Sequence, residues 1–210
     1  MSLLDQLSSR AGARDAGPNR GVAALCMENP ALLDDVVAGL QSQDAALAGD
    51  CAEVLTLVAE QVPVHVAPHA AALVPLLAHK TTRVRWEAMH ALALVASLAP
   101  KVVGRQLAGL AEIVRSDKSV IVRDYAVDAI GGYAETGAPA ARKAVPLLRE
   151  ALTAWDGKHA GHALKGLAAA AAAAPGLRAE LLAIGEQYLA DKRGAVRKAA
   201  RQLVRAAQAG

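Results

Sequence analysis

The sequence predicts an all-α protein built from repeated helix pairs, and two periodic features support this. The phrase Val-Arg-x-x-Ala recurs with its arginines at Arg85, Arg123 and Arg197, which are separated by 38 and 74 residues, or one and two periods of about 37. Prolines recur at similar intervals, at Pro30, Pro63, Pro100, Pro139 and Pro175. A repeat of this length predicts a right-handed α-solenoid of about five and a half helix pairs.

The individual helices are predicted from the spacing of their apolar residues. Val84, Ala88 and Val95 share one helical face, and the same pattern returns from Val122. Proline ends one helix of a pair and is tolerated in the first turn of the next, while Asp and Ser at the other boundary can cap the following helix. First helices are expected near residues 19–29, 44–61, 82–98, 119–135, 158–174 and 194–208. Second helices are expected near residues 31–41, 68–79, 101–115, 139–154 and 176–190.

The chain is predicted to contain one domain with an N-terminal extension. Residues 1–18 begin with an apolar pattern and then loosen through glycine and proline, so they are expected to form a cap and a mobile join. Residues 19–210 are expected to form a single solenoid domain, because each repeat buries its apolar face only against its neighbours.

Composition predicts a tightly packed helical core in a cytoplasmic protein. Hydrophobic residues make up 54% of the chain and aromatic residues only 2%, so the core must consist of Ala, Leu and Val. The longest apolar run, residues 166–175, is about half of the roughly 20 residues that cross a membrane, so no membrane partner is expected. The N-terminal residues lack the apolar region of a signal peptide. Cys26 and Cys51 are predicted to be buried free thiols.

Charge is distributed unevenly along the chain. Residues 1–100 carry 6 basic and 10 acidic side chains, whereas residues 101–210 carry 17 basic and 10 acidic side chains. The net charge is thus about −4 in the first part and about +7 in the second. A basic half of this kind can attract an acidic protein surface or a polyanion, although a solvated surface is the more common meaning.

These residues resemble the HEAT repeat family over about residues 19–208. In that family an antiparallel helix pair has a proline near its turn and an aspartate six residues before an arginine, as Asp117 and Arg123 have here and Asp191 and Arg197 repeat. The resemblance implies a structural ladder between neighbouring repeats that involves these four side chains and Arg85. His79 takes the aspartate position before Arg85, and Ala154 and Ala160 replace both residues in the fifth unit, so the ladder is expected to be interrupted.

The sequence contains no pattern that requires catalysis. Gly-x-Ser-x-Gly, a phosphate-binding glycine loop and paired Cys-x-x-Cys are all absent, so we expect no catalytic residue, no cofactor and no small-molecule substrate. The histidine pairs His65/His69 and His159/His162 have helical spacings that also occur in metal sites, but spacing alone is weak evidence. No metal site is predicted, and the repeated His-Glu dipeptides of HEAT-type metal hydroxylases are missing.

The preferred function is a noncatalytic scaffold or adaptor that binds a protein partner in the concave groove of the solenoid. HEAT arrays serve in this way, with outward residues of successive second helices as contacts. The candidate contacts, chosen by helical register, are Arg105, Glu112, Arg142, Lys143 and Arg149.

The alternative is a nucleic-acid-binding protein that uses the basic C-terminal half. HEAT-like alkylpurine DNA glycosylases are similar in size and repeat number, although no catalytic aspartate aligns here. In this hypothesis an aromatic side chain contacts bases or sugars while cations bind phosphates. The candidate contacts are Trp155, Lys192, Arg193, Arg197 and Arg201. The outward face of a terminal solenoid helix must also be polar, so capping explains the same basic residues.

Overall fold

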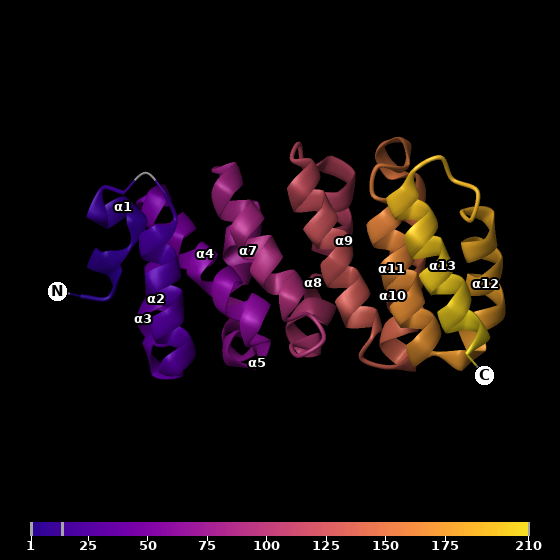
Figure 1. The fold of residues 1–210 in the computed structure, drawn as a ribbon, viewed down its shortest axis with the longest axis horizontal. Helices are drawn as coiled ribbons and strands as arrows, with labels where there is room; N and C mark the ends of the chain where they lie inside the picture. The colour runs from indigo at the N-terminus through magenta and orange to yellow at the C-terminus, as the bar shows by residue number, and fades with distance from the viewer. Residues whose placement is uncertain (1, 14, 210) are drawn as a thin grey trace. The chain divides into compact units, whose positions relative to one another are not determined.

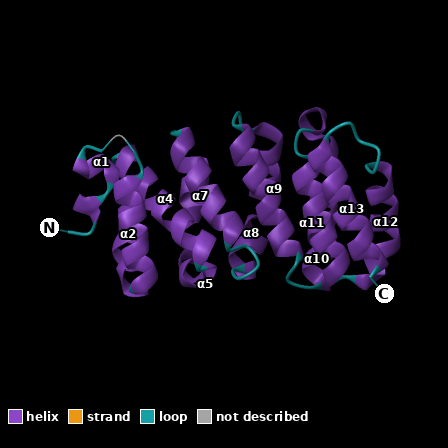
Figure 2. Cartoon of the chain, in the orientation of Figure 1, coloured by secondary structure: helices purple, strands orange, loops and turns teal. Residues whose placement is uncertain are grey.

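The computed structural model describes residues 2–13 and 15–209, and every regular element within them is a helix (Figure 2). The all-α prediction is therefore confirmed. The chain divides into two compact units, Met1–Ala99 and Pro100–Gly210, which we call unit 1 and unit 2. The expectation of a single solenoid domain over residues 19–210 remains a prediction.

Unit 1 contains three long first helices, and each of them packs against the next one along the chain (Figure 1). These are α2 (Gly17–Glu28), α4 (Ala45–Gln61) and α7 (Thr82–Leu94). The connecting layer consists of shorter pieces: η2 (Pro30–Leu32), α3 (Leu33–Gly39), α5 (Pro63–Val66), η3 (Ala67–His69), α6 (Ala70–Leu73) and η4 (Val74–Ala78). Two small elements precede them, η1 (Leu4–Gln6) and α1 (Ser8–Ala11).

Unit 2 is more regular, with helices in two layers (Figure 1). The first helices α9 (Val120–Ala134), α11 (Ala160–Ala173) and α13 (Gly194–Gln208) pack against one another in order. The other layer contains α8 (Pro100–Ser116), α10 (Ala138–Gly157), η5 (Pro175–Leu177) and α12 (Arg178–Gln187). Each of α8, α10 and α12 contacts the first helix that follows it, which is how an array of helix pairs buries its apolar faces.

The core contains the apolar stripes that the sequence predicts. Val84, Ala88 and Val95 are fully buried in unit 1, and Val122 and Ala126 are fully buried in unit 2. Both cysteines are free and fully buried, as predicted. Because most of these side chains are small, helices can approach closely, and α9 and α11 cross where Gly131 faces Gly166.

The prediction of one second helix near residues 68–79 is wrong. The segment is instead a succession of short α and 3-10 pieces from Pro63 to Ala78. Pro68 and Pro75 interrupt it, because proline lacks the N–H that a helix uses and its ring clashes with the preceding turn. The terminal helix, in contrast, runs from Gly194 to Gln208 as predicted.

The N-terminal segment packs onto the first repeat instead of standing apart from it. Leu7 is fully buried, and the main-chain N–H of Ser8 donates to Asn19 Oδ1 at 2.9 Å. The cap and mobile join expected over residues 1–18 remain a prediction, and residues 1 and 14 lie outside the described residues.

Candidate functional site

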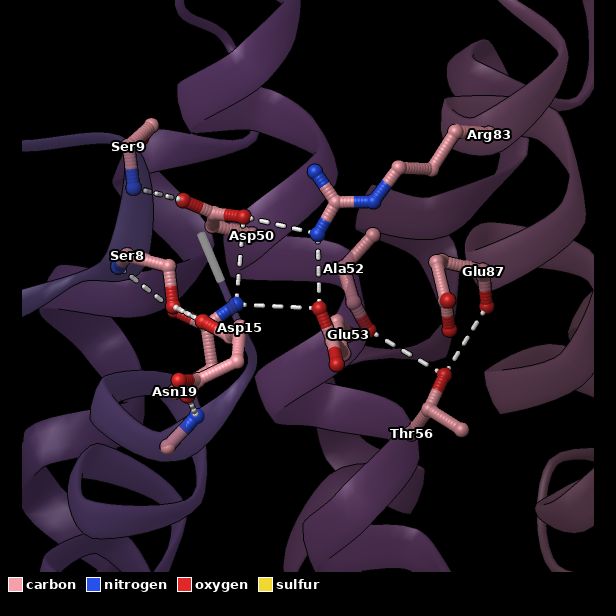
Figure 3. A network of polar contacts seen from close by, with 11 residues as sticks. Ser8, Ser9, Asp15, Asn19, Asp50, Ala52, Glu53, Thr56, Arg83 and Glu87 are labelled. Atoms are coloured by element: carbon pink, nitrogen blue, oxygen red, sulfur yellow. Dashed lines mark hydrogen bonds and ion pairs between the residues drawn. The ribbon is translucent and has the colours of Figure 1, made fainter. Parts of the chain in front are cut away.

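A polar network joins the N-terminal segment to the first helices of unit 1 (Figure 3). Its centre is Asp50 on α4, which is 1% exposed. Asp50 accepts hydrogen bonds from the main-chain N–H of Ser9 at 2.7 Å and from Asn19 Nδ2 at 3.1 Å. Arg83 Nη2 donates to it at 2.7 Å. Burial alone raises the pKa of Asp50, but these hydrogen bonds outweigh burial and hold that pKa below its ordinary value.

Glu53 lies one turn further along α4 and shares the same donors. Arg83 Nη2 lies 2.6 Å from Glu53 Oε2, and Asn19 Nδ2 lies 2.9 Å from the same oxygen. One guanidinium and one amide therefore hold two carboxylates together, which removes most of the repulsion between them. Because the donors come from α2 and α7, the network also joins three successive first helices.

Glu87 on α7 lines a cavity of about 390 Å³ beside this network, together with Trp86, Glu53 and Arg83. The Glu87 side chain is almost completely buried. Burial, followed by the charge of Glu53, raises the pKa of Glu87 to about 7. The charge of the cavity therefore changes near neutral pH.

A second polar cluster lies inside unit 2, around the buried guanidinium of Arg123. Arg123 Nε donates to His159 Nε2 at 3.0 Å, and His159 Nδ1 lies 2.7 Å from Asp124 Oδ1. Because an arginine nitrogen can only donate, His159 Nε2 accepts, and the ring proton sits on Nδ1 facing the carboxylate. His159 is fully buried with both ring nitrogens engaged, so it is not available to a substrate.

Trp155 completes this cluster and is held in place by it. Its ring lies 3.8 Å from the Arg123 guanidinium carbon, and its Nε1 donates to the Val114 carbonyl at 2.8 Å. Trp155 and Asp156 both have positive φ, so the helical backbone of α10 is interrupted by a sharp kink near its C-terminal end, before α11 begins. These contacts give Trp155 a structural role, although the side chain remains 40% exposed.

The arginines of the recurring phrase share one local contact. Each donates to the main-chain carbonyl six residues earlier: Arg85 to His79 at 2.8 Å, Arg197 to Asp191 at 2.7 Å, and Arg123 to Asp117. The contact forms at His79 as well as at aspartate, because it uses the backbone. Arg123 additionally reaches the following repeat at His159. The ladder between aspartate and arginine side chains remains a prediction.

The predicted partner-binding residues lie on the exposed surface of α8 and α10. Arg105 and Lys143 border one hollow of about 470 Å³, which we call the basic hollow. Arg142 and Arg149 border another of about 430 Å³, beside Glu180 of α12. Arg149 Nη1 is ion-paired with Glu180 at 2.7 Å, and Glu112 lies 3.7 Å from Arg115.

The predicted nucleic-acid contacts divide into two groups. Arg193 is ion-paired with Asp191 at 2.8 Å and also donates to the Gly157 carbonyl at 2.6 Å. Together with Arg197, which is bonded to loop carbonyls, it stabilises the turn before α13. Lys192 and Arg201 are exposed, and neither forms an ion pair within residues 2–13 and 15–209. Arg193 therefore lies beside the turn that contains Trp155, and a shared nucleic-acid-binding role for the five residues remains a prediction.

Sequence reasoning missed Arg83 as the residue that links repeats in unit 1. It stands two positions before the recurring arginine, where the other repeats have Ile121 and Ala195. Periodicity gave no signal for it because it occurs in one repeat only. The sequence offered one signal, because Arg83 is a basic residue about one repeat after the acidic Asp50, and the two could form an ion pair between neighbouring repeats.

No group of side chains suited to hold a metal ion occurs in the part of the chain that the structure describes. None of its described helices is long and apolar enough to span a bilayer.

Comparison with known proteins identifies the fold and no sequence family. No protein-family model and no curated protein matches the chain. A designed armadillo repeat protein in complex with the peptide (KR)4 is similar in structure, with a TM-score of 0.73, 18% identity and 97% of each chain covered. An engineered protein from the Northeast Structural Genomics Consortium has a TM-score of 0.69 at 23% identity and covers 100% of both chains. An archaeal HEAT-like repeat protein from Thermococcus onnurineus NA1 has a TM-score of 0.67 at 12% identity, over 91% of this chain and 76% of that one. The fold is that of the HEAT-like and armadillo helical repeat proteins, as the sequence predicted.

Proposed function

We propose that this protein is a noncatalytic binding module for a protein partner, which contacts the exposed surface of α8 and α10 in unit 2. The observation that carries the proposal is the pair of hollows beside these helices, since both are bordered by exposed basic side chains on successive second helices. A repeat array presents side chains in this way without needing a single deep pocket.

The chemistry of the buried histidine supports a noncatalytic role. The His159–Asp124 pair resembles the base of a catalytic site, but Arg123 occupies the nitrogen that such a base would need. In unit 1, Asp50 and Glu53 have their oxygens bonded to Arg83 and Asn19. Both clusters therefore stabilise the repeats in which they occur.

A structural neighbour supports peptide or protein recognition. The designed armadillo repeat protein with a TM-score of 0.73 was solved in complex with the peptide (KR)4, so this fold can bind a peptide. The partner of the present chain need not have the basic charge of that peptide, because residues 101–210 carry 17 basic and 10 acidic side chains.

The test is affinity capture with three forms of the tagged protein. The first is the natural chain. The second carries alanine at the five predicted contacts, and the third carries alanine at matched exposed cations away from both hollows. The contact variant replaces Arg105, Glu112, Arg142, Lys143 and Arg149, and the control replaces Lys118, Lys158, Lys192, Lys198 and Arg201.

We expect a defined protein to be captured by the natural and control forms, to be absent with the contact variant, and to survive nuclease treatment. Circular dichroism must show equal helix content for all three forms. Equal capture by all three would refute the proposal. Recovery of nucleic acid that is lost only with the control variant would favour the nucleic-acid alternative, because that variant removes Lys192 and Arg201, two of the four cations predicted for it.

A further inference from the structure

The basic hollow has a defined construction within unit 2. Its lining residues come from α8, from the N-terminal part of α10 and from Tyr133 and Thr136 at the C-terminal end of α9. The Tyr133 ring lies against the α8 backbone at Gly104, where an added Cβ would be 2.9 Å from Tyr133 Cε2. Any larger residue at Gly104 would displace the ring. Glycine at this position therefore allows Tyr133 to line the hollow.

Three cations around this hollow lack a charge partner. Lys101 and Arg105 are one turn apart on α8, and Lys143 faces them from α10. None of the three forms an ion pair or side-chain hydrogen bond with another residue of the described ranges. On the same two helices Arg115 pairs with Glu150 at 2.5 Å and Arg149 pairs with Glu180 at 2.7 Å. No carboxylate is among the residues that line the hollow.

The Tyr133 hydroxyl is a second, independent feature. The side chain is 8% exposed, and its hydroxyl has no hydrogen-bond partner within the described residues, although it borders the hollow. The neighbouring Thr136 hydroxyl already donates to the Tyr133 main-chain carbonyl at 2.8 Å. The hydroxyl itself is not among the buried polar atoms of the described residues, so it is open to the hollow, where a ligand oxygen would accept its proton.

We propose that the basic hollow binds aspartate or glutamate carboxylates from an acidic segment of the protein partner. This inference rests on the proposed function and names the partner's chemistry. Three unpaired cations attract the segment, and the Tyr133 hydroxyl donates to one carboxylate oxygen. Nucleic acid fits this hollow less well, because bases stack on exposed aromatic faces and the Tyr133 ring is nine-tenths buried against Gly104.

The experiment measures binding of a fluorescein-labelled peptide of alternating glutamate and glycine to the full chain by fluorescence anisotropy at low salt. A peptide of alternating lysine and glycine and a labelled single-stranded oligonucleotide are the comparison probes. The variants are Lys143→Glu, Tyr133→Phe and Lys198→Glu. The last is the matched control, because it makes the same change of charge at an exposed residue of α13 that does not line the hollow.

We expect the acidic peptide to bind and the lysine peptide not to bind. Lys143→Glu should weaken binding of the acidic peptide about tenfold or more, because it places a like charge against the ligand. Tyr133→Phe should weaken it roughly threefold to tenfold, since one hydrogen bond to a charged group is lost and the ring is kept. Lys198→Glu should change it by less than about twofold, as expected for a distant surface charge.

Equal loss for Lys143→Glu and Lys198→Glu would overturn the inference, because it would reflect net charge alone. Binding unchanged by both Lys143→Glu and Tyr133→Phe would also overturn it, as would tighter binding of the oligonucleotide that depends on Lys143. The proposed function is tested separately. If the acidic peptide fails to bind while the five-residue contact variant still loses its captured protein, the acidic chemistry is wrong and the binding surface stands.

Discussion

At the scale of single residues, Arg123 shows how a buried charge is compensated in this protein. Its side chain is 2% exposed, and its charge is met by the His159 ring, the Asp117 carbonyl and the face of Trp155. Removing one partner of such a cluster is costly, because the remaining polar atoms stay buried without hydrogen bonds. Arg105, by comparison, is an exposed arginine on α8.

The first prediction follows from this difference. Arg123→Ala should lower the free energy of unfolding by about 3 kcal/mol, since it leaves His159 Nε2 unpaired and opens a space beneath Trp155. Arg105→Ala should change it by less than about 0.5 kcal/mol, as surface substitutions usually do. Urea denaturation followed by circular dichroism measures both. Equal midpoints for the two variants would contradict this assignment.

Glu87 leads to the second prediction, which concerns pH. Its pKa is about 7 in the folded protein and near 4.5 when unfolded, so the folded state binds the proton more tightly. Stability is therefore highest at low pH within this window and falls as pH rises from 4.5 to 7. The loss is about 3 kcal/mol at most. Glu87→Gln should remove this loss, so the variant should melt at a higher temperature than the natural chain at pH 8 but not at pH 5.

The titration of His162 also changes the stability of the protein over part of this pH range, so His162 provides the control for the Glu87 prediction. The hydrogen bond that His162 Nδ1 donates to the Asp128 carboxylate raises the pKa of His162 above its ordinary 6.5. Its contribution to stability is therefore present below pH 6.5 and is lost as pH rises through the raised pKa. The Glu87→Gln variant should keep this part of the pH dependence, and His162→Gln should lose it. If Glu87→Gln leaves the slope between pH 4.5 and 6.5 unchanged, Glu87 is not the group responsible.

At the scale of helices, α9 and α11 approach each other closely at a pair of glycines in unit 2. An added Cβ on Gly131 would lie 2.9 Å from the Gly166 Cα, which is a backbone atom and cannot rotate away. On the same helix as Gly166, an added Cβ on Gly161 meets nothing within 4 Å. Alanine substitutions at these two positions therefore separate the effect of helix packing from the effect of replacing a glycine within a helix.

The third prediction compares these two glycines. Gly131→Ala should destabilise the protein by about 1–3 kcal/mol, because the two helices must move apart. Gly161→Ala should be neutral or stabilising by up to about 1 kcal/mol, because alanine has the better helix propensity. Thermal denaturation of the two variants beside the natural chain tests this. A stabilising Gly131→Ala would mean that α9 and α11 do not cross at these glycines.

Element boundaries were predictable where one local signal dominated. The α13 helix begins at Gly194, after a polar loop, and its apolar face contains Val196, Ala200 and Leu203, so spacing alone located it. The apolar spacing around Pro68 and Pro75 predicts one continuous helix, but the two prolines interrupt it. Proline cannot donate the N–H that a helix needs, so this segment forms short helical turns. These turns still bury its hydrophobic residues.

At the scale of the whole chain, periodicity predicted which residues share a register, and packing determined which of them touch. The repeat placed Arg85, Arg123 and Arg197 in equivalent positions, and all three donate to the carbonyl six residues earlier. It did not predict Arg83 as a link between α4 and α7, because that side chain occurs in one repeat. The basic hollow was likewise only partly predicted, as Arg105 and Lys143 were identified without Lys101 or Tyr133.

The final prediction uses the two cysteines as reporters of opening in unit 1. Both thiols are fully buried, and burial raises the pKa of Cys26 to about 11 and that of Cys51 to about 12. The thiolate is the species that attacks a disulfide reagent, so both residues should be inert in the native protein at mildly alkaline pH and should react together in denaturant. Ellman's reagent measures the rate, and Cys26→Ala leaves Cys51 alone for assignment. Fast native labelling of Cys51 would contradict the packing of α4 against Gly39, whose added Cβ would lie 2.5 Å from the Cys51 sulfur. Slow labelling that accelerates with urea would instead show that this part of unit 1 must open before its thiols react.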